Sequence, residues 1–315
     1  MNLIEIHETF KTDDDCLEYL AKLRWPDGVR CVTCGTKEVR QYSSLTKKQP
    51  SRKIYQCQEP TCKQQFTATA GTIFHDTHMP LTKWFLALSI IVDAKKGVAA
   101  KQLQRHLKCS YKAAWYLGHR IRKAMEETDG SLLTGTVEMD ETYVGGKTIR
   151  RKDRGNRRYE NKDAVFGIIQ RGGHLRLRYL GKGSATAAKV RPFIRENVAR
   201  DVERVITDES TIYPYAFDGY CASKHETIRH KDKIYVTGVD THTNTVESAF
   251  SLFKRAVMGT YHVLSIKHLQ RYLHEREYVF NRRKETNRFE ETLARMACAK
   301  PMPFTTLIAE PSEAV

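Results

Sequence analysis

In the stretch Thr136-Val137-Glu138-Met139-Asp140, the apolar side chains of Val137 and Met139 alternate with the acidic side chains of Glu138 and Asp140. Alternation with a period of two predicts a half-buried β-strand. Two further strand-like runs follow at 164–171 and 175–181, a helical pattern covers about 185–198, and another strand is expected at 202–208. With the helical segment 244–257, this order predicts an α/β domain built on a mixed sheet.

Three acidic residues occupy distinctive places in this pattern. Asp140 and Asp208 each end a strand-like run, and Glu247 lies in the helical segment 244–257. Ligands of α/β folds bind at strand ends, and carboxylates are preferred ligands of hard divalent cations. Each acid also has a plain structural interpretation, as a strand-end cap or, for Asn244-x-x-Glu247, as a helix capping box. The three acids together favour a metal site, in which two cations would promote nucleophilic displacement at a phosphate group.

Composition favours a polyanionic partner. The 315 residues include 53 Lys and Arg against 37 Asp and Glu, which gives a formal net charge of +16. Such an excess of positive charge favours nucleic acid as the partner, although a basic enzyme with another substrate has the same composition. The sequence has no apolar run of membrane-spanning length and no secretory signal pattern at its start. We therefore expect no membrane association, and a cytoplasmic location with association to the nucleoid when DNA is bound.

Four of the eight cysteines form two pairs, Cys31-x-x-Cys34 and Cys57-x4-Cys62, separated by 22 residues. Pairs at this spacing predict a structural zinc site closed by four thiolates. A zinc ribbon of this size depends on its metal for folding. We expect a lead-in helix and the ribbon to fill residues 1–78, and the other cysteines to be buried without a role.

A helical region is expected at 79–130. Two amphipathic patterns lie on either side of a short break at Lys108-Cys109-Ser110, which is typical of a helix-turn-helix. Its second helix would turn basic side chains towards DNA; these are Lys112, His119, Arg120 and Arg122. A plain helical hairpin is the alternative interpretation.

A second basic segment spans Lys147–Lys162 and contains eight Lys and Arg residues and two acids. We expect a loop or hairpin that becomes ordered on DNA, with Lys147, Arg150 and Arg151 as contacts. A solvated charge run is the alternative. The catalytic domain is expected to cover 131–290, followed by a C-terminal tail at 291–315.

Ordered motifs give the chain a family resemblance. They are the segment 137–147 (VEMDETYVGGK), Thr207-Asp208-Glu209-Ser210, the segment 242–248 (HTNTVES), Lys254-Arg255, Gly259-Thr260-Tyr261-His262, Arg271-Tyr272-Leu273-His274-Glu275 and Asn281-Arg282-Arg283. Together with the cysteine pairs, this set resembles insertion-sequence transposases of the ISXO type, which are similar to the Merlin group of eukaryotic elements. The resemblance implies a ribonuclease-H-like core with a DDE triad formed by Asp140, Asp208 and Glu247, and Lys254 as the basic residue downstream.

The third position has an alternative, because some members of this group carry Asn there and this chain has Asn244 one turn before Glu247. We favour Glu247, since it lies seven residues before Lys254 and a carboxylate is the better ligand for a hard cation. Glu141, beside Asp140, would either support the metal ligands from behind or have no role in the site, and Arg255 beside Lys254 is a candidate phosphate contact.

The resemblance implies a DNA transposase that cleaves at the ends of its element and joins the 3′ ends to target DNA. Its cofactors would be structural Zn²⁺ and catalytic Mg²⁺ or Mn²⁺, with two catalytic ions. Its partners would be the terminal inverted repeats and target DNA, bound by a homodimer or higher oligomer. Two alternatives are a ribonuclease-H-fold nuclease or resolvase without strand transfer, and a DNA-binding regulator derived from a transposase.

Overall fold

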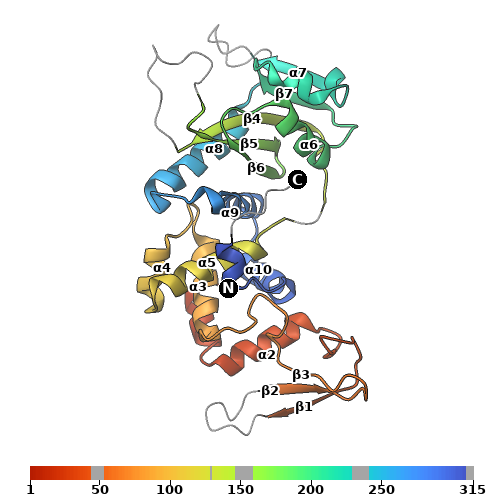
Figure 1. Cartoon of the computed structure of the whole chain (residues 1–315), viewed down its shortest axis with the longest axis vertical. Helices are drawn as coiled ribbons and strands as arrows, with labels where there is room; N and C mark the ends of the chain where they lie inside the picture. Colours follow the sequence, from red (N-terminus) through yellow and green to blue (C-terminus); the bar gives the residue numbers. More distant parts are fainter. Residues whose placement is uncertain (44–52, 128–129, 146–158, 229–240, 310–315) are drawn as a thin grey trace. The chain divides into compact units, whose positions relative to one another are not determined.

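The computed structural model describes residues 1–43, 53–127, 130–145, 159–228 and 241–309 (Figure 1). The chain divides into two compact units, Met1–Met125 with Glu285–Val315, and Glu126–Lys284. The C-terminal segment treated above as a tail therefore belongs to the first unit, and the second unit ends six residues before the expected boundary at 290. In the described part of the chain, no helix combines the length and the apolar character that crossing a membrane requires.

The second unit is built on a five-stranded sheet. Its strands are β4 (Thr136–Val144), β5 (Asp163–Gln170), β6 (Leu175–Lys182), β7 (Arg204–Asp208) and β8 (His225–Ile228). Their spatial order is β6-β5-β4-β7-β8. The pairs β6–β5 and β5–β4 are antiparallel, whereas β7 pairs in parallel with both β4 and β8. This mixed sheet, with its first strand in the centre, is the ribonuclease-H-like core that the sequence predicts.

Helices cover both faces of this sheet (Figure 1). On one face, α6 (Ala187–Asn197) and α7 (Ile212–Phe217) share a core with Val137 and Met139 of β4. On the other, α8 (Asn244–Ala256) and α9 (Leu269–Asn281) share a core with alternate residues of β5 and β6. Because successive strand residues point to opposite faces, Glu138 and Asp140 of β4 point to the α8 face. The described part of the unit also contains three short turns: η2 (Ala222–Lys224), the π-helical η4 (Val257–Tyr261) and η5 (Ile266–His268).

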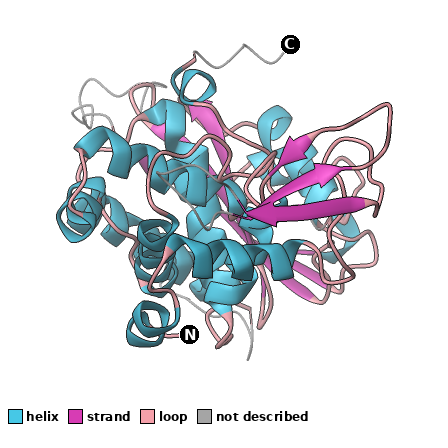
Figure 2. Cartoon of the chain, turned by 90° about the horizontal axis from the view of Figure 1, so that it is seen from below, coloured by secondary structure: helices cyan, strands magenta, loops and turns pink. Residues whose placement is uncertain are grey.

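The first unit combines a small sheet with a helical cluster; the strands of both sheets are magenta in Figure 2. The small antiparallel sheet comprises β1 (Val39–Ser43), β2 (Lys53–Cys57) and β3 (Gln65–Phe66). The helices are α1 (Leu3–Thr9), α2 (Asp13–Arg24), α3 (Leu81–Asp93), α4 (Ala100–Leu107), α5 (Tyr111–Ala124), α10 (Arg288–Cys298) and α11 (Phe304–Ile308). The expected lead-in helix is α2, which begins with a capping box between Thr12 and Asp15. Phe289 of α10 packs against Phe85 of α3, which joins the C-terminal segment to this unit.

The helical hairpin in the first unit has the expected connection. Lys108 ends α4 in the left-handed conformation, and the Ser110 hydroxyl caps α5 by accepting the backbone N–H of Ala113. The break at 108–110 therefore separates two helices as expected, which is compatible with both a helix-turn-helix and a plain helical hairpin.

Candidate active site

Strand pairing brings the two aspartates together. Glu138 of β4 pairs in parallel with Ile206 of β7, and Asp140 and Asp208 each lie two residues further along their strands. Both side chains therefore lie at the same level on adjacent strands and on the face covered by α8. Asp208 ends β7 as expected, but β4 continues to Val144, so Asp140 lies inside its strand instead of at its end.

Glu247 approaches this pair from the first turn of α8. Partial burial raises the pKa of Asp140 to about 8, and the negative charges of Glu141, Asp208 and Glu247 add to the shift. Like charges raise the pKa of a carboxyl only when they lie near it. The charges of Asp208 and Glu247, which lie on two other elements, therefore both act on the Asp140 carboxyl, that of Glu247 least. Asp140, Asp208 and Glu247, the expected triad, are called the acidic group below.

Local hydrogen bonds orient each carboxylate. Asp140 accepts the Glu141 N–H at 2.8 Å, and Asp208 accepts the Ser210 N–H at 3.1 Å. Glu247 accepts the Thr243 hydroxyl at 2.8 Å. Asn244, the alternative third residue, is the first residue of α8 and not its N-cap, so the suggested Asn244–Glu247 capping box is not formed.

Glu141 alternates with Asp140 and points to the opposite face, where it accepts the Tyr213 hydroxyl at 3.0 Å. Burial and the charge of Asp208 raise its pKa to about 7. Glu141 therefore contributes negative charge to the site from beneath the sheet.

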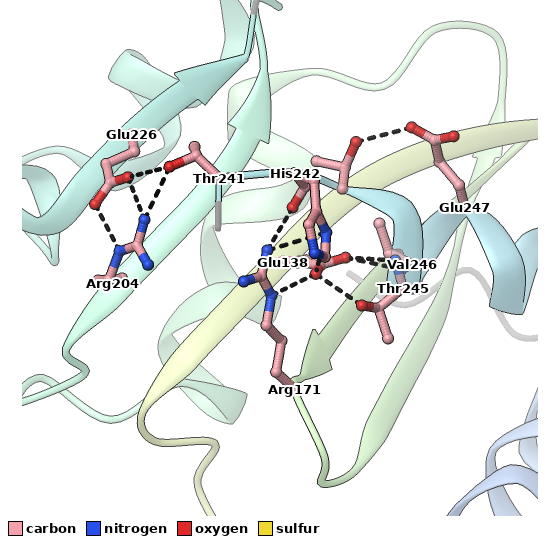
Figure 3. Close-up of polar contacts among 10 residues, drawn as sticks. Glu138, Arg171, Arg204, Glu226, Thr241, His242, Thr245, Val246 and Glu247 are labelled. Atoms are coloured by element: carbon pink, nitrogen blue, oxygen red, sulfur yellow. Dashed lines mark hydrogen bonds and ion pairs between the residues drawn. The ribbon is translucent and has the colours of Figure 1, made fainter. Parts of the chain in front are cut away.

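Glu138 is a member of the site that the sequence analysis missed. Its fully buried carboxylate accepts hydrogen bonds from the first turn of α8, the helix that carries Glu247 (Figure 3). The available signal was its spacing, since an acid two residues before Asp140 must share its face of the strand.

Basic residues follow Glu247 on α8. Lys254 and Arg255 are both exposed in the last turn of the helix. Their charges are thus available to an anionic ligand beyond the acidic group. Lys147, Arg150 and Arg151 lie outside the described residues.

The four paired cysteines form a second centre, in the first unit. Their sulfur atoms all lie within 4.8 Å of one another, with 3.7 Å between Cys31 and Cys62 and 3.5 Å between Cys34 and Cys57. Four thiolates about 2.3 Å from one tetrahedral zinc would be about 3.8 Å apart, so the set fits the ion. Among the described residues, it is the one group of three or more His, Cys, Asp or Glu side chains gathered this closely.

The thiols of Cys31 and Cys57 differ in how readily they ionise. Burial opposes ionisation of Cys31, but N–H groups of Cys34 and Thr33 outweigh it and lower its pKa to about 6. Burial raises the pKa of Cys57 to about 12. A divalent cation would ionise all four thiols. Of the remaining cysteines, Cys16 and Cys221 are buried as expected, whereas Cys109 is half-buried and Cys298 is exposed.

The structure corrects the expected DNA-facing side of α5. Lys112 is exposed, with its ammonium 4.4 Å from the centre of the Phe304 ring. His119, Arg120 and Arg122, however, are buried, with exposed fractions of 0%, 5% and 3%. They therefore do not form the open face of a recognition helix.

Aromatic and backbone partners explain this burial. The Arg120 guanidinium lies over the Trp84 ring and donates to the carbonyls of Ile73 and His75. The His119 ring packs edge-on against Trp115 at 4.5 Å. Cation–π contact and carbonyl acceptors compensate a charge removed from water.

Both centres lie in regions of the chain that match known protein families. Residues 132–281 match the ISXO2-like transposase domain, and residues 11–65 match the transposase zinc-ribbon domain. A protein of Halobacterium salinarum, described as an uncharacterized protein in transposable element ISH50, is 30% identical over 260 residues, which cover 79% of this chain and 84% of that protein.

Two solved structures of Mos1 mariner transposase are also similar. Its catalytic domain is 14% identical with a TM-score of 0.28, covering 53% of this chain and 84% of that chain. Its paired end complex with Mn is 15% identical with a TM-score of 0.27, covering 67% of this chain and 78% of that chain.

Proposed function

The chain belongs to the ISXO2-like transposase family, and on this premise we propose that it cleaves DNA at the ends of an insertion sequence and joins the 3′ ends to target DNA. The observation that supports the proposal most is the register of β4 and β7, which puts Asp140 and Asp208 at the same level on adjacent parallel strands; Glu247 lies in the first turn of α8, and its charge acts on Asp140.

The acidic group offers the oxygen ligands that hard divalent cations prefer, although its side chains are not gathered as closely as the four thiols. Oxygen ligands from Asp140, Asp208 and Glu247 would hold two Mg²⁺ or Mn²⁺ ions, which when bound supply an activated nucleophile and stabilise the leaving oxygen. The high pKa of Asp140 follows from burial and uncompensated negative charge, so cations would relieve that repulsion and release its proton. The same carboxylates would serve cleavage and joining in turn, because both are phosphoryl transfers.

Basic side chains would hold the DNA. Lys254 and Arg255 lie about two helical turns beyond Glu247, so they would place backbone phosphates beside the acidic group. Lys112, Lys147, Arg150 and Arg151 remain proposed DNA contacts. The zinc ribbon would bind structural Zn²⁺ through Cys31, Cys34, Cys57 and Cys62, and two element ends would require a dimer or higher oligomer.

The test uses purified zinc-loaded protein, Mn²⁺ and a duplex that carries the DNA flanking the gene. We expect Asp140→Asn and Asp208→Asn to abolish cleavage while the duplex is still bound. Asp218→Asn is the matched control, because this exposed aspartate of the same unit forms ion pairs with Arg191 and Arg195 away from the acidic group. Full cleavage by either active-site variant would remove that residue from the site.

A supercoiled plasmid added as target separates the alternatives. A transposase yields plasmid with the duplex covalently joined through its 3′ ends. Cleaved duplex without joined plasmid identifies a nuclease or resolvase. Binding without cleavage at any Mn²⁺ concentration identifies a regulator.

A further inference from the structure

Helix α8 begins without a cap from its own sequence. The first N–H groups of a helix have no partner within it and need other acceptors. The N-cap residue, Thr243, makes no side-chain hydrogen bond to the helix backbone; its hydroxyl donates to Glu247. The acceptor for these N–H groups must come from elsewhere in the fold.

Glu138 of β4 supplies it. One carboxylate oxygen, Oε2, accepts the backbone N–H groups of Thr245 and Val246 at 2.9 and 3.0 Å, and Oε1 accepts the Thr245 hydroxyl at 2.8 Å (Figure 3). The carboxylate is fully buried, and its negative charge lies at the positive end of the helix dipole. A residue more than a hundred positions away in the sequence thus caps α8.

Arg171 extends this network to His242, the residue before the N-cap of α8. Its Nε donates to Glu138 Oε1 at 2.7 Å, and its Nη2 donates to the carbonyl oxygen of His242 at 2.8 Å. The guanidinium balances the buried carboxylate, which would otherwise be costly to bury. Thr241, the residue before His242, is held by a neighbouring ion pair. Arg204 donates to the Thr241 hydroxyl at 3.0 Å and to the Glu226 carboxylate (Figure 3).

The geometry links this cap to the acidic group. Glu138 and Asp140 lie on the same face of β4, separated by one residue, while Val246 and Glu247 are consecutive in the first turn of α8. One side chain therefore fixes the start of the helix against the strand that carries Asp140. A shift of α8 would move Glu247 relative to both aspartates.

We propose that Glu138 is a positioning residue, which caps α8 from β4 and thereby sets Glu247 in place to share a cation with Asp140 and Asp208. This inference rests on the function proposed above. Glu138 itself faces the helix backbone and Arg171, so it acts through Glu247 and not on the substrate.

The experiment measures Mn²⁺ affinity of the zinc-loaded full chain by titration, with free Mn²⁺ read by electron paramagnetic resonance. Outer residues that orient metal ligands typically contribute about 10- to 100-fold to metal affinity, and we expect a weakening in this range for Glu138→Gln. Glu277→Gln is the matched control, since this buried glutamate of the same unit also accepts a backbone N–H, that of Leu177, but lies on α9. Its Mn²⁺ affinity should equal that of the unmodified protein.

A double-mutant cycle with Glu247→Gln separates positioning from general destabilisation. If Glu138 acts through Glu247, Glu138→Gln causes no further loss of Mn²⁺ affinity once Glu247 has been replaced. Equal losses in both backgrounds, or unchanged affinity in a folded Glu138→Gln protein, would overturn the inference. Thr245→Val, which removes only one donor to Glu138, provides the same cycle if Glu138→Gln does not fold.

The outcome also distinguishes this inference from the proposed function. If Asp140→Asn abolishes Mn²⁺ binding while Glu138→Gln has no effect, only the positioning role fails. If the unmodified protein binds no Mn²⁺ beyond what Asp140→Asn binds, the proposed metal site fails and the positioning role fails with it.

Discussion

At Asp140, burial and neighbouring charge act in the same direction. Both disfavour the ionised carboxylate, and they raise its pKa from an ordinary value of 3.8 to about 8. The nearby Glu141 is shifted in the same sense, to about 7. A site that gathers acids in this way is destabilising until cations or protons neutralise it.

This predicts how stability changes with pH in protein without added Mg²⁺ or Mn²⁺. Between pH 4 and 8, Asp140 is protonated in the folded chain but ionised after unfolding, so unfolding releases a proton and stability falls as the pH rises. The contribution is complete below the ordinary pKa and is lost above about pH 8. Urea unfolding of zinc-loaded protein at a series of pH values measures this slope.

Asp140→Asn isolates the contribution of this residue, because Glu141 and the buried Glu277, whose pKa burial raises to about 8, titrate in both proteins. The variant should lack the part of the pH dependence of stability that Asp140 causes. This part corresponds to at most about one proton released on unfolding. It should also be more stable than the unmodified protein at pH 8. Parallel stability curves for the two proteins would contradict the electrostatic account of the site.

At the scale of elements, the zinc ribbon should depend on its four thiolates. Cys31, Tyr55, Cys57 and Phe66 form its small core, which is too small to hold three short strands without a metal. We predict that Cys57→Ser loses about one zinc ion per chain and unfolds the ribbon. Zinc content by atomic absorption and protease sensitivity of residues 1–78 measure both effects.

Cys298→Ser is the control for this prediction, because Cys298 is exposed at the end of α10 and outside the cluster. It should retain its zinc and resist protease. Equal zinc content in the Cys57 and Cys298 variants would show that the cluster does not hold the ion.

The packing of α8 on the sheet makes a separate prediction at Gly167. This residue of β5 pairs with Asp140, and a Cβ added there would lie 2.7 Å from Phe250 Cζ of α8. Phe250 is buried and cannot move aside freely, so Gly167→Ala should destabilise the unit by about 1–3 kcal/mol. It should also weaken Mn²⁺ binding, because α8 carries Glu247.

Gly259→Ala is the matched control, since an added Cβ at this position of the same unit would meet nothing within 4 Å beyond its own turn in the described part of the chain. Unfolding in urea and Mn²⁺ titration compare the two variants. A Gly167→Ala protein as stable as Gly259→Ala would mean that α8 does not pack against the sheet at this point.

Regular patterns made the central elements predictable. The alternation at 136–140 and the apolar runs near 164–171 and 202–208 correspond to β4, β5 and β7, and the helical segment at 244–257 corresponds to α8. β8 was not predicted, because His225–Ile228 is short, largely polar and at the sheet edge. Local pattern identifies an element only when one of its faces is consistently buried.

Long-range contacts account for what the sequence analysis missed at the site. The cap on α8 comes from Glu138, and no spacing rule connects residues so far apart in the chain. The interpretation of α5 failed for a related reason, since it assumed that charged side chains face water. Arg120 instead finds Trp84 and backbone carbonyls inside the unit.

In the whole molecule, basic and acidic side chains have different proposed roles. The chain carries a net charge of +16, yet the proposed catalytic centre is a group of acidic side chains. In the proposed function, basic residues outside that group would attract the DNA, and bound cations would screen the acids from phosphate. Binding of this kind releases counterions from DNA and weakens steeply with salt.

This separation predicts the effect of Lys254→Gln on DNA binding. Each phosphate contact contributes about 0.9 to the slope of log affinity against log salt, so losing one contact should reduce the slope by about that amount. Fluorescence anisotropy of a labelled duplex across a NaCl series measures it. Lys189→Gln is the control, because Lys189 is also exposed but belongs to α6, which covers the opposite face of the sheet from α8. If both substitutions reduced the slope equally, attraction would depend on net charge alone; a change confined to Lys254→Gln would place a phosphate beside the acidic group.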